Sequence, residues 1–137
     1  MHFLTILCSI IFIFTATTSH GTDSYFDGIQ AYNAGDFTSA YKLLLPEAEQ
    51  GFVDSQFKLG EMFESGKGVP QDDELAFKWY TAAAEQGFKV AQNNLGIMYE
   101  DGRGVAQNFT AALKWYEASA RQGYKVAQNN LGIMYEH

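Results

Sequence analysis

The chain repeats itself with a period of 36 residues. A leucine–glycine pair begins at Leu59, returns at Leu95 and returns again at Leu131. A fixed period of this length indicates a solenoid, because each supersecondary unit can bury its apolar face only against its neighbours. The repeat therefore predicts that function lies on an extended surface and not in a pocket of catalytic side chains.

Each complete repeat, over residues 55–90 and 91–126, has the pattern of a helical hairpin. Apolar residues spaced three and four apart over 91–100 predict a first helix with one buried face. A capping residue and a later glycine then delimit a second helix. The N-caps and last residues predicted for the second helices are Asp72 and Glu85, then Asn108 and Arg121.

Large aromatic residues alternate with alanines in the second helices, which indicates close packing against the first helices. The predicted inward-facing residues are Ala76, Trp79, Tyr80 and Ala84 in one repeat and Ala112, Trp115, Tyr116 and Ala120 in the next. A glycine inside a helix costs about 1 kcal/mol relative to alanine. Gly60, Gly96 and Gly132 lie inside first helices, so a close helix contact is predicted at each.

The pattern L-G-x-M-(Y/F)-E-x-G-x-G-V, followed by A-x-K-W-Y-x-A-x-A-x-Q-G, resembles the Sel-1-like repeat family. The match covers residues 55–136, most of the chain beyond its first segment. The resemblance implies an all-α fold, a right-handed α-solenoid of antiparallel helix hairpins with a tetratricopeptide-like superhelix. It also implies an interaction scaffold, in a family whose members are often exported bacterial proteins.

The first hairpin, over residues 22–54, departs from this pattern and is more similar to a tetratricopeptide hairpin. Its first helix, predicted over 24–34, aligns with the later repeats only if five loop residues are missing. Pro46 falls within its second helix and is expected to break or kink that helix near Leu44 or Leu45, unless the helix restarts there. A divergent end unit is typical of a solenoid cap.

The last segment, residues 127–137, is a partial repeat that contains a first helix only. Residues 127–136 reproduce residues 91–100 letter for letter. Three interpretations are open: a single helix that serves as a lid, a truncated gene or gene model, or an open end that docks another chain. The third interpretation includes self-association through this helix.

Residues 1–21 contain no Lys, Arg, Asp or Glu. The apolar run from Phe3 to Phe14 suits the central region of a secretory signal and is short for a membrane span. We predict a signal peptide over 1–21, with an uncleaved anchor as the alternative. Cleavage leaves a secreted or periplasmic protein with no stable membrane insertion. The single cysteine, Cys8, lies in this run, so the rest of the chain has no disulfide or thiolate metal site.

The net charge of −7 lies entirely beyond this segment, which argues against nucleic acid as a partner. The three histidines form no metal motif, and no cofactor motif is present. Ser39 and Lys42 have the S-x-x-K spacing of penicillin-recognising serine enzymes. Lys42 recurs at Lys78 and Lys114, however, as a repeat position on a solvated helix face. We expect no cofactor and no enzymatic activity.

First helices line the concave groove in solenoids of this kind, so their variable positions are candidates for binding a protein or peptide. These candidates are Phe57, Lys58, Glu61, Asn93, Asn94, Ile97, Asn129, Asn130 and Ile133. Paired asparagines one turn from an isoleucine suit an extended peptide. The alternative is that they are ordinary solvated positions, with Ile97 covered by the adjacent helix.

Two classes of function follow. The favoured class is an exported, non-catalytic interaction scaffold that binds a protein or peptide through this groove. The alternative class is an envelope protein that binds or hydrolyses β-lactams or cell-wall fragments, as the resemblance implies for cysteine-rich members of the family. The absence of cysteine pairs beyond residue 21 weighs against the alternative.

Overall fold

The computed structural model describes residues 20–136, which form seven α-helices and no strand. The helices are α1 (His20–Asn33), α2 (Phe37–Glu49), α3 (Val53–Ser65), α4 (Asp73–Glu85), α5 (Lys89–Asp101), α6 (Phe109–Arg121) and α7 (Lys125–Tyr135). The predicted signal peptide, residues 1–21, lies outside the described residues except for His20 and Gly21, which begin α1.

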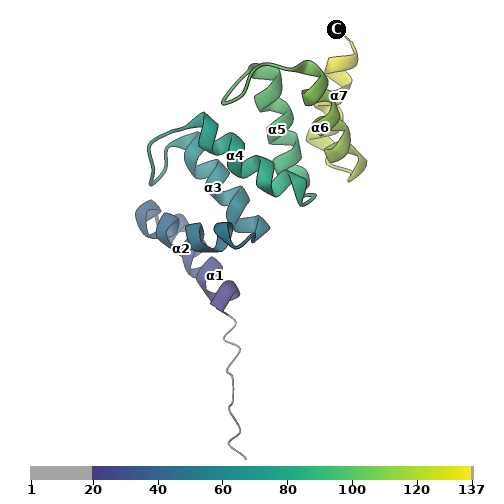
Figure 1. Cartoon of the computed structure of the whole chain (residues 1–137). Coiled ribbons are helices and arrows are strands. Elements are labelled where there is room, and N and C mark those ends of the chain that lie inside the picture. The colour runs from purple at the N-terminus through teal and green to yellow at the C-terminus, as the bar shows by residue number, and fades with distance from the viewer. Residues whose placement is uncertain (1–19, 137) are drawn as a thin grey trace, which may run out of the picture.

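The helices pack in chain order, as Figure 1 shows. Helix α1 pairs with α2, α3 with α4 and α5 with α6, and the contacts of α2 with α3, α4 with α5 and α6 with α7 join these hairpins. Contacts that run from each element to the next are the mark of a solenoid. The predicted all-α solenoid of helix hairpins is confirmed.

Local signals place the helix ends. The side chains of Asp72 and Asn108 accept hydrogen bonds from the backbone N–H groups of Leu75 and Ala111, so both predicted N-caps are confirmed. Gly66 and Gly102 end α3 and α5 with φ of 68° and 67°, a left-handed conformation that suits glycine. The second helices therefore span the residues that the sequence predicts.

The first hairpin differs from the prediction in two respects. Helix α2 runs unbroken through Pro46, so the expected break near Leu44 or Leu45 is wrong. Pro46 lies in the last turn of α2, and its carbonyl still accepts hydrogen bonds from the backbone and side-chain N–H groups of Gln50. The loop over 34–36 is four residues shorter than the loop over 66–72, whereas five missing residues were expected.

The hydrophobic core is built by side chains of the four helices α2, α3, α4 and α5. Its side chains with no solvent exposure include Leu44, Leu59, Met62, Tyr80, Leu95 and Met98. The predicted inward stripe of α4 is buried throughout. Of the four residues predicted to face inward from α6, Ala112 and Tyr116 are buried, whereas Trp115 and Ala120 are half-buried, contrary to the prediction. The reason is that a complete hairpin follows α4, whereas α7 alone follows α6 within the described residues.

Glutamines repeat the same polar contact at successive joints. The side-chain amide of Gln86 donates to Gln56 Oε1 at 2.7 Å, and that of Gln122 donates to Gln92 Oε1 at 2.8 Å. Each donor also reaches the backbone carbonyl of a glycine 35 residues earlier. Each complete hairpin therefore repeats the same polar contacts, which join the end of its second helix to its first helix and to the loop before that helix.

Candidate functional site

In each complete repeat, a tyrosine ring of the second helix packs against a glycine of the first helix. We call this glycine and the space in front of it the seat of the tyrosine. A β-carbon on Gly60 would lie 2.5 Å from the ring of Tyr80, and one on Gly96 would lie 2.6 Å from the ring of Tyr116. Atoms this close cannot coexist, so both positions require glycine. The predicted close contact at these two glycines is confirmed.

The tyrosine hydroxyls complete these seats. Tyr80 donates to Glu64 Oε2 at 2.6 Å, and Tyr116 donates to Glu100 Oε2 at 2.6 Å. Burial raises the pKa of both tyrosines above the ordinary value, and the neighbouring carboxylate raises it further. Both hydroxyls are therefore neutral hydrogen-bond donors over the physiological pH range.

The corresponding seat on α7 is open. A β-carbon on Gly132 would meet no atom within 4 Å, so the predicted contact is not made here by any described residue. Helix α7 has one buried residue, Ala127, whereas α5 has six. Because residues 127–136 are identical to residues 91–100, the difference arises from which described residues pack against each helix and not from the sequence of the helix.

Polar contacts hold α7 in place despite its open face. The side-chain amide of Asn130 donates to Asn93 Oδ1 at 3.1 Å, which ties α7 to α5. The hydroxyl of Tyr135 donates to Glu117 Oε1 at 3.0 Å, which ties α7 to α6. The open face is thus presented by a helix that is anchored along its length.

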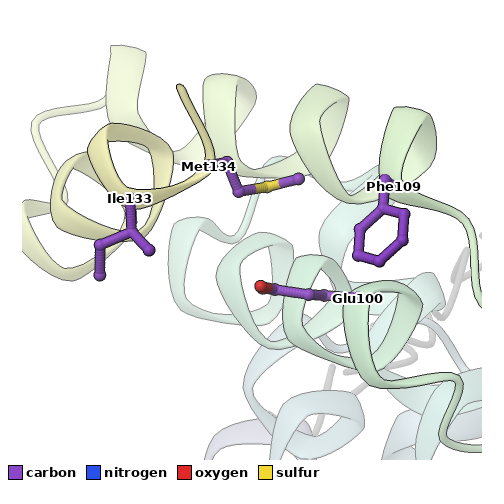
Figure 2. A pocket seen from close by; sticks show the side chains of 4 residues that line it. All are labelled: Glu100, Phe109, Ile133 and Met134. Carbon is purple, nitrogen blue, oxygen red and sulfur yellow. The ribbon is translucent and has the colours of Figure 1, made fainter. Parts of the chain in front are cut away.

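A cavity of about 410 Å³ lies beside this face, between the ends of α5 and α7 and the start of α6. Figure 2 shows its lining residues, Glu100, Phe109, Ile133 and Met134. Phe109 is 56% exposed and Ile133 is 54% exposed, so two large apolar side chains stand open to solvent at this cavity. Together with α7, these residues form what we call the terminal face, defined by Glu100, Phe109, Gly132, Ile133, Met134 and Glu136.

The structure distributes the nine predicted groove residues over three kinds of environment. Phe57 packs between the rings of Tyr80 and Phe88, and Asn93 is only 2% exposed, so both belong to helix joints and not to an open surface. Lys58 pairs with Glu61 and lies over the ring of Tyr32. The remaining candidates are half-buried or exposed and lie on α5 and α7: Asn94, Ile97, Asn129, Asn130 and Ile133.

Only Ile133 of this set lines the cavity of Figure 2. The prediction missed Glu100, Phe109 and Met134, although the repeat carried a signal for them. Glu100 and Met134 stand at positions where the other repeats carry the same residue. Phe109 stands at the position that Asp73 occupies one repeat earlier. A comparison of repeat positions in the second helices, which the groove argument left out, would have singled out Phe109.

Within residues 20–136, no helix has the length and apolarity to cross a membrane. No group of three or more His, Cys, Asp or Glu side chains among them is arranged to hold a metal ion.

The fold and the terminal face define a helical-repeat protein of the tetratricopeptide-like class. The family described as Sel1 repeat matches residues 53–88, 89–124 and 125–137. The chain belongs to this family, whose members generally mediate protein–protein interaction. The matched frame starts two residues before the predicted repeat boundaries and keeps the same period.

Solved structures agree with this assignment. A Sel1 repeat protein from Oxalobacter formigenes is 36% identical, with a TM-score of 0.76 over 80% of this chain and 45% of its own. A protective antigen of uropathogenic Escherichia coli with an SLR fold is 35% identical, with a TM-score of 0.80 over 84% of this chain and 26% of its own. This chain thus spans less than half the length of either protein.

A cysteine-rich protein B from Helicobacter pylori shares the fold at 21% identity, with a TM-score of 0.65 over 84% of this chain and 98% of its own. At this identity the likeness concerns the fold alone. No curated protein sequence matches the chain.

Proposed function

We propose that this chain is an exported, non-catalytic interaction scaffold that binds a protein or peptide through the groove along its first helices. One observation supports the proposal: five of the nine predicted groove positions, all on α5 and α7, keep part of their side-chain surface exposed. They are Asn94, Ile97, Asn129, Asn130 and Ile133.

The test places a photocrosslinking residue at Asn129, an exposed groove position on α7, and in a second variant at Glu85, an exposed position on the second helix α4, as the matched control. The full chain is irradiated in the cells that make it, and crosslinked proteins are identified by mass spectrometry. A protein crosslinked from position 129 and not from position 85 is expected. The same crosslinks from both positions would refute binding through the groove.

Export rests on the uncharged, apolar segment that opens the sequence. Cell fractionation followed by intact mass measurement tests it, because a product that starts near Thr22 outside the cytoplasm requires signal cleavage. Light scattering on the same material tests whether a second copy is the partner. The alternative envelope activity predicts nitrocefin turnover that is lost in Ser39→Ala, and we expect no turnover.

A further inference from the structure

A second cavity lies between the first three helices. Its volume is about 290 Å³, and it is bounded by α1, by the last turn of α2 and by the first turn of α3. The residues that line it are Tyr25, Phe26, Glu47, Phe52, Val53, Asp54 and Ser55. Two of the rings stand partly in solvent, since Phe26 is 62% exposed and Phe52 is 45% exposed. The cavity therefore combines aromatic walls with two carboxylates.

One of these carboxylates is buried with an oxygen left open. Glu47 is only 3% exposed, and its Oε2 accepts from the Ser55 hydroxyl at 2.9 Å. Its Oε1 is buried and accepts from no described residue. Neither Glu47 nor Asp54 pairs with a basic side chain among the described residues. A buried carboxylate is costly unless donors or a cation compensate it, so the open oxygen points to a missing donor.

The packing of the repeat does not account for this carboxylate. Glu47 and Ser55 stand where Ala83 and Ala91 stand one repeat later, and both alanines are fully buried. Two small apolar side chains therefore suffice to join a second helix to the next first helix at this place. Because the fold requires no charge here, we look for the role of Glu47 in binding.

We propose that this cavity binds a primary alkylammonium group, carried by a lysine side chain of the protein or peptide partner. An ammonium group brings the N–H donor that Oε1 of Glu47 lacks, together with the opposite charge. The rings of Tyr25 and Phe26, whose centroids lie 5.9 Å apart, line the cavity together with Phe52. Aromatic rings attract a cation and also cover the apolar stem of a lysine side chain.

Lysine fits this cavity better than other cations. Because Ser55 already occupies Oε2 of Glu47, only one oxygen of that carboxylate is open among the described contacts. A single open oxygen suits the compact charge of an ammonium group, whereas a guanidinium group presents paired donors that match two oxygens. A quaternary ammonium group has no N–H and would leave the buried oxygen without a donor.

This inference deepens the proposed function and rests on it for the source of the lysine. Two first helices, α1 and α3, supply five of the seven lining residues. The cavity and the proposed groove are therefore formed by the same class of helix. A partner that lies along the first helices can place a lysine in the cavity while it contacts the exposed positions on α5 and α7.

The test titrates the full chain, with isotope-labelled valine methyl groups, with Nα-acetyl-lysine methylamide. The methyl resonances of Val53, which lines the cavity, should shift, and those of Val126, an exposed residue of α7, should not. Glu47→Gln should weaken binding of this probe on the order of tenfold, because the amide keeps the shape of the side chain and loses its charge. Glu49→Gln makes the same change of charge at an exposed position of the same helix and should bind normally.

A second variant keeps the test decisive if Glu47→Gln fails to fold. Glu47→Ala copies the buried Ala83 of the next repeat, so it should fold and should lose binding of the probe. The norleucine analogue of the probe, which has no ammonium group, should cause no shift. Equal binding of the lysine probe by Glu47→Ala and Glu49→Gln, or no shift of Val53 in the unsubstituted chain, would overturn the site.

Further probes decide between cations and between sources. Tighter binding of the arginine or trimethyl-lysine analogue would overturn the choice of a primary ammonium group. Tighter binding of the butylammonium ion than of the lysine probe would assign the cavity to free amines and overturn the lysine of a partner. The probes need no partner, so the site and the groove are tested separately. A positive titration without crosslinks from position 129 would support the ammonium site and count against the groove alone.

Discussion

The ring of Tyr116 packs against Gly96 so closely that a β-carbon on Gly96 would be 2.6 Å from two ring carbons. The same ring sends its hydroxyl to Glu100, one turn further along α5. One tyrosine thereby fixes both the separation and the register of two helices. The terminal face is the same arrangement with the tyrosine absent.

Glycine-to-alanine substitutions should have opposite effects on the two identical helices. Gly96→Ala should lower the free energy of unfolding by about 1–3 kcal/mol, because the added methyl overpacks the core. Gly132→Ala should raise it by up to about 1 kcal/mol, because alanine favours the helix and nothing lies within reach of the new methyl. Urea denaturation measures both. Shifts of the same sign would show that the open face is covered in solution.

Alkaline pH should destabilise the protein through its buried tyrosines. The folded state holds the pKa of Tyr80 above its ordinary value of 10, by burial and by its hydrogen bond to Glu64. A raised pKa means that the neutral form is favoured by folding, so this stabilisation is complete below about pH 10 and is lost as pH rises above it. Thermal unfolding between pH 8 and 11 should show the loss, and Tyr80→Phe should show less of it.

The two tryptophans should differ in their contribution to stability. Trp79 is 9% exposed within the core, so Trp79→Ala should cost about 3–5 kcal/mol. Trp115 is half-buried, because α7 has no second helix beside it among the described residues, and Trp115→Ala should cost less. Parallel denaturant titrations give the comparison. A larger loss for Trp115 would contradict the burial described for α6.

Glu47 and Ser55 should be coupled in a double-mutant cycle. The buried carboxylate of Glu47 accepts from the Ser55 hydroxyl at 2.9 Å, and its other oxygen has no partner among the described residues. Ser55→Ala alone should destabilise by about 1–3 kcal/mol, because the carboxylate loses its remaining donor. Adding Glu47→Ala should recover part of that loss, since Ala83 and Ala91 occupy the same places one repeat later. Strictly additive losses would argue against the coupling.

Local signals explain why so much of the fold could be predicted. The side chains of Asp72 and Asn108 cap their own helices, and Gly66 and Gly102 end helices by their own left-handed conformation. These effects act within a few residues, so the sequence near each one suffices to place it. Pro46 was misjudged because a proline removes one hydrogen bond to the residue four places earlier, and the burial of Leu44 and Ala48 beside it holds the helix despite that loss.

The terminal face could not be predicted in the same way. Glu100, Phe109 and Met134 meet only when three helices pack, and they are distant from one another in the sequence. The predicted groove residues all lie on first helices, so the first residue of each second helix was left out of the prediction. The contacts of Lys67 with Phe37 and of Arg103 with Glu64 likewise join neighbouring hairpins, so they could be recognised only in the folded protein.

The sequence by itself determined the period, the family, the ends of the second helices and the need for glycine at Gly60 and Gly96, because each of these follows from local or repeated chemistry. Only the tertiary structure decided which copy of the repeat is open. Residues 91–100 and 127–136 are the same ten letters, yet Leu95 and Met98 are fully buried while Leu131 and Met134 are not. Burial is a property of what packs against a helix, so identical sequences form a core in one place and an exposed surface in the other.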